Sequence, residues 1–384
     1  MGPLLGGAFT EKTTWRWCFY INLPVGTVSA LFIIFFFQSP AASKSRENTK
    51  WWSALFQMDP VGTLLMLACV TCYILAMQYG GETYPWNSSV VIGLIVGFVV
   101  ILAALCGWEL YMGEMAMSCP RLVKRHAIPS AVGFFFFGSY IVVIYYLPIY
   151  FQSIDGVSAI GSGVHNLPFI ISVSIFTVLS GIFISMTGYP APFVISGAAV
   201  GTIGCGLIYT FNIGTSTGTW IGYQILAGIG NGFGVQVPMI MAQGNTDPQD
   251  MAPATAILMC KFSCSICYSI YPPNCPDSRS IGFQTIGGAF MQSGAQAAFA
   301  NRLLIELPNT GPGGDPAAVV AAGATQLQSF GSSLHGVRLA YMDGLKVTFA
   351  FACASMGVAF ILALFSRRAR IGGEAAKNAM APAA

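Results

Sequence analysis

The chain has 384 residues, of which 55% are hydrophobic and only 8% charged, and its mean hydropathy is +0.67. Soluble globular chains carry about 25% charged residues, so this composition largely excludes a soluble enzyme, and its hydrophobicity excludes disorder. The net charge of +3 includes no basic block, so no nucleic-acid partner is expected. Long unbroken apolar runs favour an all-α polytopic membrane protein over a β-barrel, whose strands alternate in short segments.

Apolar runs of the length needed to cross a ~30 Å hydrocarbon core, about 20 residues each, recur along the chain. They lie at roughly 21–38, 60–79, 90–110, 131–151, 166–188, 192–212, 220–243 and 347–366, with a further, disturbed span somewhere in 252–300. The eight undisturbed spans contain one charged residue, Glu109, at the end of its helix. A charge at mid-bilayer costs about 2.5–3.5 kcal/mol, so a bilayer demands this near-absence of charge.

Basic residues are unevenly divided between the connecting segments. Ten of the seventeen lie in the loop 39–59, the loop 111–130 and the tail 367–384, which are separated by even numbers of spans and therefore share one face. The opposite face carries five, and the remaining two, Lys261 and Arg279, lie in the disturbed stretch and are not assigned to a face. The positive-inside rule predicts that these three segments are cytosolic and that the Gly/Pro/Ala-rich loop 301–346 lies outside.

No catalytic or metal-ligating motif stands in a suitable context, so we expect no enzyme activity, no cofactor and no metal. The three histidines are far apart and are interpreted as solvated loop residues: His126, His165 and His335. Trp86 and Trp220 are interpreted as members of the aromatic belt at the membrane interface.

The glycine-rich run GIGNGFG at 228–234 lies inside an apolar helix, which argues against a phosphate-binding loop. Gly228 and Gly232 form one pair of small residues spaced by four, and Gly230 and Gly234 form a second. Such pairs let two helices approach closely, so the run predicts helix packing.

Uncharged polar side chains within or beside the spans form the candidate substrate-binding set. The set comprises Gln78, Tyr145, Tyr146, Gln152, Gln224, Asn231 and Gln236. Amides in lipid must find partners or face an aqueous cavity. Gln224 and Asn231 have the spacing of one helix face, whereas Gln236 lies about 140° around the helix from Asn231. Two interpretations remain open: hydrogen bonds between helices, or the lining of a cavity for an amphipathic, aromatic-tolerant solute. Pro148 and Pro238 can bend their helices nearby.

The opening segment GPLLGGAFTEKTTWRWCFYINLPVG resembles the fifth-helix end, outer loop and sixth-helix start of major facilitator superfamily drug:proton antiporters. The best match is the fourteen-helix branch, in particular fungal toxin-efflux pumps such as the aflatoxin and HC-toxin exporters. Gly2, Pro3, Gly6 and Gly7 resemble the second half of that family's antiporter motif. The resemblance continues over nearly the whole chain through LAMQYGGETYPWNSS, IYYLPIYFQSIDGVSAIGSGVHNLPFI, TGYPAPF and WIGYQILAGIGNGFGVQVPMIMAQ.

The resemblance implies a partial major-facilitator-type helix bundle. In this family two six-helix halves flank two extra helices, so 1–38 would be the end of the N-terminal bundle. The extra pair would be 60–110, and 131–366 would be a complete C-terminal six-helix bundle. The four helices that the family places before Gly2 would be missing, together with a cytosolic loop motif and the fourth-helix arginine linked to proton coupling. The resemblance therefore implies a chain truncated at its N-terminus.

The stretch 260–282 interrupts an apolar pattern. Deleting 261–282 would join APATAILMC to FQTIGGAFMQSGAQAAFA, a continuous stretch long enough to span the bilayer. We interpret 261–282 as a translated intron, because codons for 260–262 can contain a GTAAGT donor and codons for 281–282 an AG acceptor. A genuine insertion and a metal site are the alternatives, and transcript sequencing decides between them. The metal site would use four cysteines with only one CxxC pair, which is weak evidence: Cys260, Cys264, Cys267 and Cys275.

The family resemblance implies a secondary active transporter of the plasma membrane or a vacuolar-type membrane. It would expel hydrophobic small molecules or toxins by proton-coupled alternating access, and the absence of an ATP-binding motif agrees with coupling to an ion gradient. Its partners would be the substrate, protons and the lipid bilayer. The alternative is a non-transporting truncated membrane fragment or pseudogene product, and a mature chain that begins at Met1 is expected to show no proton-coupled transport.

Overall fold

The computed structural model describes residues 2–36, 59–112, 127–244, 283–309 and 333–366, with single positions at 319, 323, 324, 327 and 330. The suspected intron 261–282, the tail 367–384 and most of the two basic loops lie outside these residues. Within the described ranges, eight helices are long and apolar enough to cross a membrane. This confirms the prediction of an all-α polytopic membrane protein.

The chain begins with three helices: α1 (Gly2–Lys12), the single turn α2 (Trp17–Tyr20) and α3 (Asn22–Phe36). α1 packs against the short helix α9 (Ala159–His165), which lies far away in the sequence. The side chains of α3 are exposed along its whole described length. Because these side chains are almost all apolar, α3 has the surface of a helix that faces lipid or other helices.

A helical hairpin follows, made of α5 (Pro60–Tyr79) and α6 (Ser89–Met112). Asp59, in the left-handed conformation with φ of 49°, precedes the first helical residue, Pro60. Its carboxylate accepts a hydrogen bond from the Gly62 N–H at 2.9 Å and another from the Trp108 Nε1–H at 2.8 Å. The same side chain therefore caps α5 and ties its start to the end of α6.

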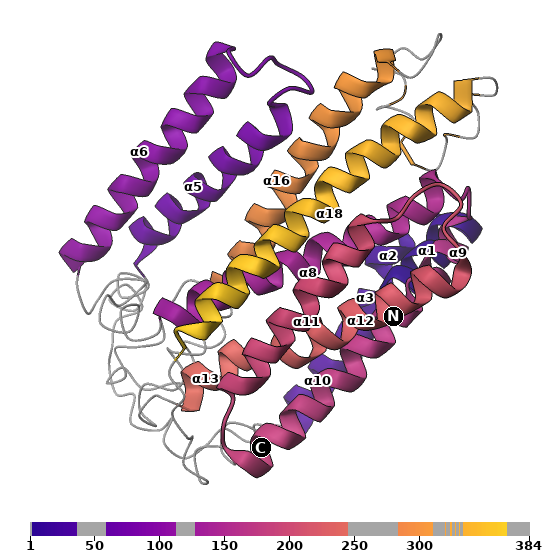
Figure 1. Cartoon of the computed structure of the whole chain (residues 1–384). Coiled ribbons are helices and arrows are strands. Elements are labelled where there is room, and N and C mark those ends of the chain that lie inside the picture. Colours follow the sequence, from indigo (N-terminus) through magenta and orange to yellow (C-terminus); the bar gives the residue numbers. More distant parts are fainter. Residues whose placement is uncertain are drawn as a thin grey trace.

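The hairpin docks on α16 (Phe283–Glu306), and Figure 1 shows α5 lying between α6 and α16. Near the middle of α5, the Tyr73 ring stacks on Phe290 with centroids 4.1 Å apart. At the turn of the hairpin, the Asn301 amide donates to the Gly80 carbonyl at 3.1 Å. The Asn301 carbonyl oxygen accepts from the Trp86 indole N–H at 2.9 Å. One side chain of α16 thus holds both sides of the turn.

Replacing Asn301 by leucine is expected to loosen this docking, because both hydrogen bonds to the turn are lost. The expected cost is about 1–3 kcal/mol, measured as a lower midpoint of thermal unfolding of the purified protein in detergent. Asn309→Leu is the matched control: Asn309 is exposed and donates to the Ile305 carbonyl of its own segment. The control is expected to change stability by less than about 0.5 kcal/mol. Equal losses in the two variants would contradict the docking role.

In the described residues from 127 onward, six helical segments pack into a bundle, and all of them except α16 are among the eight apolar helices. The six segments are α8 (Ala127–Ser153), α10 (Leu167–Thr187), α11 (Ala191–Tyr209), α12 (Thr217–Gly234) continued by α13 (Val237–Gly244), α16, and α18 (Leu334–Leu364). α12 packs against α10 and α11, while α8 packs against α16 and α18. The 3₁₀ turn η4 (Leu307–Asn309) ends α16. The main buried cluster lies among these helices.

The glycines of α12 make the close helix contacts that their spacing predicts. A Cβ on Gly228 or Gly232 would press on the backbone of α10, within 2.8 Å of the Phe169 carbonyl oxygen and 2.7 Å of the Val173 carbonyl oxygen. A Cβ on Gly230 would overlap the backbone of Gly201 in α11. The packing interpretation of this run is therefore confirmed. One row of glycines in α12 packs against α10, and a second row packs against α11.

α18 is longer than the sequence predicted. It contains 31 residues, about 46 Å of helix, and begins at Leu334 instead of near 347. Its added turns continue a buried stripe at helical spacing, formed by Val337, Ala340, Tyr341, Gly344 and Leu345. The prediction of one loop over 301–346 is therefore wrong at its ends, because 301–306 and 334–346 are helical.

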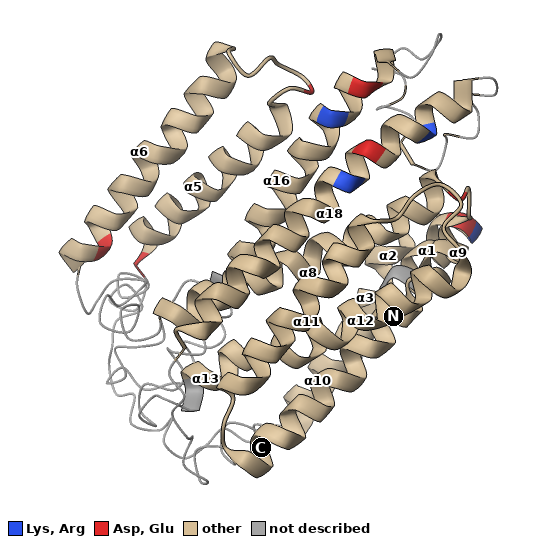
Figure 2. Cartoon of the chain, viewed as in Figure 1, with Lys and Arg blue, Asp and Glu red and all other residues tan. Residues whose placement is uncertain are grey.

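Charged side chains of the described residues lie mostly toward the ends of the helices (Figure 2). Asp59 and Glu109 lie at the paired ends of α5 and α6, and Arg302 and Glu306 form an ion pair of 2.8 Å near the end of α16. Most helices therefore have no charge near their middle, as the cost of burying charge in a bilayer requires, whereas α18 carries Asp343 and Lys346 about a third of the way along its length.

Candidate functional site

The buried face of α12 carries two amides of the candidate set. Gln224 and Asn231 are both fully buried, on the shared face that their spacing predicts. Within the described part of the chain, neither amide atom of Gln224 has a hydrogen-bond partner, and the Asn231 carbonyl oxygen has none. The Asn231 nitrogen donates to the Ala227 carbonyl of its own helix at 2.9 Å. These two amides therefore do not make the hydrogen bonds between helices that one of the two interpretations expects.

Contacts one turn away on either side define where Gln224 lies. The Trp220 ring packs on His165 with centroids 4.9 Å apart, and Gly228 lies against the Phe169 backbone. Since residues four apart lie one above the other on a helix, Gln224 faces the junction of α9 and α10 between these contacts. Its amide is thus buried beside aromatic rings and the start of a helix.

The junction of α9 and α10 adds two further buried polar atoms without partners in the described residues, His165 Nδ1 and Asn166 Oδ1. The His165 ring packs on both Trp220 and Phe151, and these two rings also contact each other, with centroids 5.0 Å apart. The interpretation of His165 as a solvated loop residue is therefore wrong. The belt interpretation of Trp220 is also wrong, because that side chain is only 8% exposed. Both errors come from α9, which covers this end of the bundle.

The candidate residues of α8 behave differently from those of α12. The fully buried Tyr146 donates its hydroxyl hydrogen to Gln296 Oε1 of α16 at 2.8 Å. Gln152 donates from Nε2 to Ser162 Oγ of α9, also at 2.8 Å. Tyr145 is 53% exposed and points away from the core. On α8 the buried polar side chains of the candidate set therefore mainly make hydrogen bonds to other helices.

Two candidate residues lie apart from this group. Gln78 is exposed on α5, outside the six-span bundle. Gln236 is exposed in the two-residue break between α12 and α13, just before Pro238. Pro238 has no N–H to offer the Gly234 carbonyl, which explains why the helix is interrupted there. The structure does not bring these two side chains to the buried face that holds Gln224.

α16 carries a row of amides that the candidate set missed. Gln284, Gln292 and Gln296 recur at multiples of four residues, so they follow a row that turns gradually around the helix. Gln284 donates from Nε2 to the Val235 carbonyl at the break after α12, at 3.1 Å. The Oε1 atoms of Gln284 and Gln292 are buried without a partner in the described residues. The signal was the regular spacing of glutamines in FQTIGGAFMQSGAQ, at the edge of the disturbed stretch.

The glycines that resemble the antiporter motif lie on α1, beside α9. A Cβ on Gly7 would crowd the Ala159 backbone, whereas Gly6 has open space around it. The Glu11 carboxylate accepts from the Ile160 N–H at 3.1 Å, at the start of α9. The first turn of the same helix holds the remaining two residues, Gly2 and Pro3.

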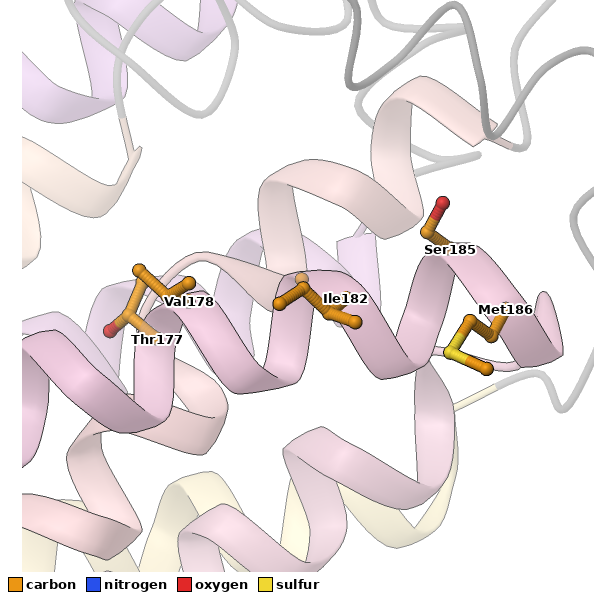
Figure 3. Close-up of a pocket in the computed structure, with 6 residues that line it drawn as sticks. Thr177, Val178, Ile182, Ser185 and Met186 are labelled. Carbon is orange, nitrogen blue, oxygen red and sulfur yellow. The ribbon is translucent and has the colours of Figure 1, made fainter.

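An open groove of about 430 Å³ runs along α10 and contains no residue of the candidate set. Its walls come from one face of this single helix, as Figure 3 shows. The lining residues are Thr177, Val178, Gly181, Ile182, Ser185 and Met186. The groove is a feature of the helix surface and is separate from the buried amides of α12.

Comparison with known proteins gives matches along nearly the whole chain. Residues 1–132 match the family model for the fungal trichothecene efflux pump. The chain is 48% identical over 383 residues to the MFS-type transporter grgE of Penicillium sp, covering 99% of this chain and 64% of that protein. It is 43% identical over 370 residues to the probable efflux pump gsfJ of Penicillium aethiopicum, covering 95% and 62%. It is 39% identical over 364 residues to the MFS-type efflux pump MFS1 of Trichophyton rubrum, covering 94% and 64%.

The chain thus spans less than two thirds of the length of these relatives. The matched length nevertheless includes every described span of the bundle, and the helical architecture agrees with the architecture that the sequence motifs imply. Over this matched length the chain is similar to MFS-type transporters and efflux pumps.

Proposed function

We propose that the protein is a secondary active transporter that exports hydrophobic small molecules by alternating access, and that it performs no enzymatic chemistry. Its membrane-spanning bundle and the efflux pumps among its relatives support this function. We further propose that export is coupled to protons. We place the protein in the plasma membrane, with a vacuolar-type membrane as the alternative. Both extensions rest on the family resemblance.

The observation that carries the proposal is the amide of Gln224, which is buried and has no hydrogen-bond partner among the described residues. Burying a polar group without a hydrogen bond costs about 1–3 kcal/mol. A ligand that offers both a donor and an acceptor would recover this cost when the bundle opens. The Trp220 ring, one turn before Gln224 on the same helix face, offers flat apolar surface beside the amide. This combination suits an amphipathic solute with an aromatic body.

We assign the direct contacts with substrate to Gln224 and Asn231. Tyr146 and Gln152 are proposed to act by holding α8 to α16 and to α9, because each already has a hydrogen-bond partner on another helix. Tyr145, Gln78 and Gln236 would contribute only in another conformation of the bundle, since all three are exposed here. The close glycine contacts of α12 with α10 and α11 support movement of these three helices as one body.

The test is efflux of a fluorescent hydrophobic drug from cells that express the gene from its own genomic locus. Deleting the gene is expected to slow efflux, reintroducing it to restore the rate, and a protonophore to abolish the restored part. Unchanged efflux and unchanged toxin sensitivity after deletion would refute the transport proposal. Restored efflux that survives the protonophore would refute only the proton coupling.

A further inference from the structure

α8 contains a proline at position 148, and this proline interrupts the hydrogen-bond ladder of the helix. Because Pro148 has no N–H, the Ile144 carbonyl one turn earlier loses its usual partner within the helix. A carbonyl left without a partner at membrane depth is costly, so another group must supply the hydrogen bond.

The group that supplies it is the side chain of Asn166. Its amide nitrogen donates to the Ile144 carbonyl oxygen at 3.4 Å, and the side chain is fully buried. Asn166 is also the N-cap residue of α10, where an asparagine ordinarily accepts from an N–H of its own first turn. It makes no such bond here. Pro168, in that first turn, has removed one of the N–H groups that a cap would use.

The proline separates two sets of contacts along α8. Before it, Tyr146 is bonded to α16. After it, the Tyr150 hydroxyl donates to the Asn212 carbonyl at 2.9 Å, and Gln152 donates to Ser162. The last turns of α8 are therefore tied to α9 and to the loop after α11, while the preceding turns are tied to α16.

A second span with an internal proline, Pro238, has a related arrangement. α12 stops at Gly234 and α13 starts at Val237, and the Val235 carbonyl at this break accepts from the Gln284 amide at 3.1 Å. In both spans, a buried amide from outside the helix pairs with a carbonyl in the turn before a proline. The recurrence indicates that these amides stabilise sites of bending.

We propose that Asn166 and Pro148 form a hinge in α8, in which the Asn166 amide holds the Ile144 carbonyl and ties the turn before Pro148 to the start of α10, while the last turns of α8 can bend. Asn166 acts through α8 and is a positioning residue for transport. A hydrogen bond from a side chain can break and re-form as the helix bends, whereas a complete ladder would stiffen it.

The first test is a double-mutant cycle in thermal unfolding of the full chain in detergent. Asn166→Leu is expected to lower the unfolding midpoint on the order of 2–4 °C. In the Pro148→Ala background the same substitution should cost less than half as much, because the new N–H at position 148 pairs with the Ile144 carbonyl. Equal losses in both backgrounds would overturn the pairing.

The second test needs only the Pro148→Ala variant. It therefore still tests the hinge if the Asn166→Leu variant fails to fold. Hydrogen exchange of the α8 peptide that covers 144–153 is expected to slow by about threefold or more in this variant, because the ladder is complete. Unchanged exchange would overturn the hinge.

The third readout is the efflux rate, and it rests on the transport function proposed above. Pro148→Ala should slow efflux severalfold without lowering the unfolding midpoint, a split that a purely structural role would not produce. A wild-type rate in this variant would overturn the positioning role. If the unmodified protein itself shows no efflux, the proposed function fails, while the first two tests still decide the hinge.

Discussion

Replacing Gly230 by leucine is expected to destabilise the bundle more than any other single change discussed above. A Cβ at this position would overlap the backbone nitrogen and Cα of Gly201 and lie 2.9 Å from the Gly197 carbonyl oxygen. These are backbone atoms, which cannot rotate away, so α11 and α12 would have to separate. Overpacking of this kind costs about 3 kcal/mol or more. Thermal unfolding in detergent and the yield of folded protein measure the loss.

Gly222 provides the matched control on the same helix. It is exposed, and a Cβ there would meet no atom within 4 Å. Gly222→Ala should therefore leave the protein as stable as before, or raise its stability by about 0.5–1 kcal/mol, because alanine favours a helix. If Gly230→Leu unfolds at the same temperature as Gly222→Ala, the glycine contacts do not hold α12 to α11.

The membrane-spanning pattern was predictable because a bilayer tolerates few charges at mid-depth. The prediction was weakest where polar residues enter a helix. α16 was hidden by its glutamines, which lower its hydropathy. The first turns of α18 were assigned to a loop because Arg338, Asp343 and Lys346 interrupt the apolar run. In both cases packing against other helices of the bundle stabilises a helix that its composition alone does not indicate. The only trace of this packing in the sequence is the helical spacing of the residues that become buried.

The candidate site was predictable only in part, for a related reason. Helical periodicity placed Gln224 and Asn231 on one face, because that depends on residues seven apart. Whether an amide finds a partner depends on residues that are distant in the sequence. Tyr146 is bonded to Gln296, 150 positions away, and nothing local indicates it. The hydrogen bond from Asn166 to Ile144 likewise requires α9 to fold back over α8.

Replacing Gln224 by leucine is expected to make the protein more stable and a poorer transporter. Leucine has nearly the same size but needs no hydrogen bond, so removing the two unpartnered amide atoms should raise the free energy of unfolding by about 1–3 kcal/mol. If Gln224 binds substrate, the same change should raise the concentration for half-maximal efflux on the order of fivefold to tenfold. Thermal unfolding and concentration-dependent drug efflux measure the two effects.

Opposite changes in stability and transport are the informative outcome, because damage to the fold would lower both. Gln78→Leu is the control: this glutamine is exposed on α5, outside the six-span bundle, and its loss should alter stability by less than about 0.5 kcal/mol and leave efflux unchanged. A Gln224→Leu variant that is less stable than the unmodified protein, with unchanged efflux, would show that the amide has a structural partner. Substrate contact would then have to be sought on α16, where Gln284 and Gln292 each hold a buried oxygen without a partner in the described residues.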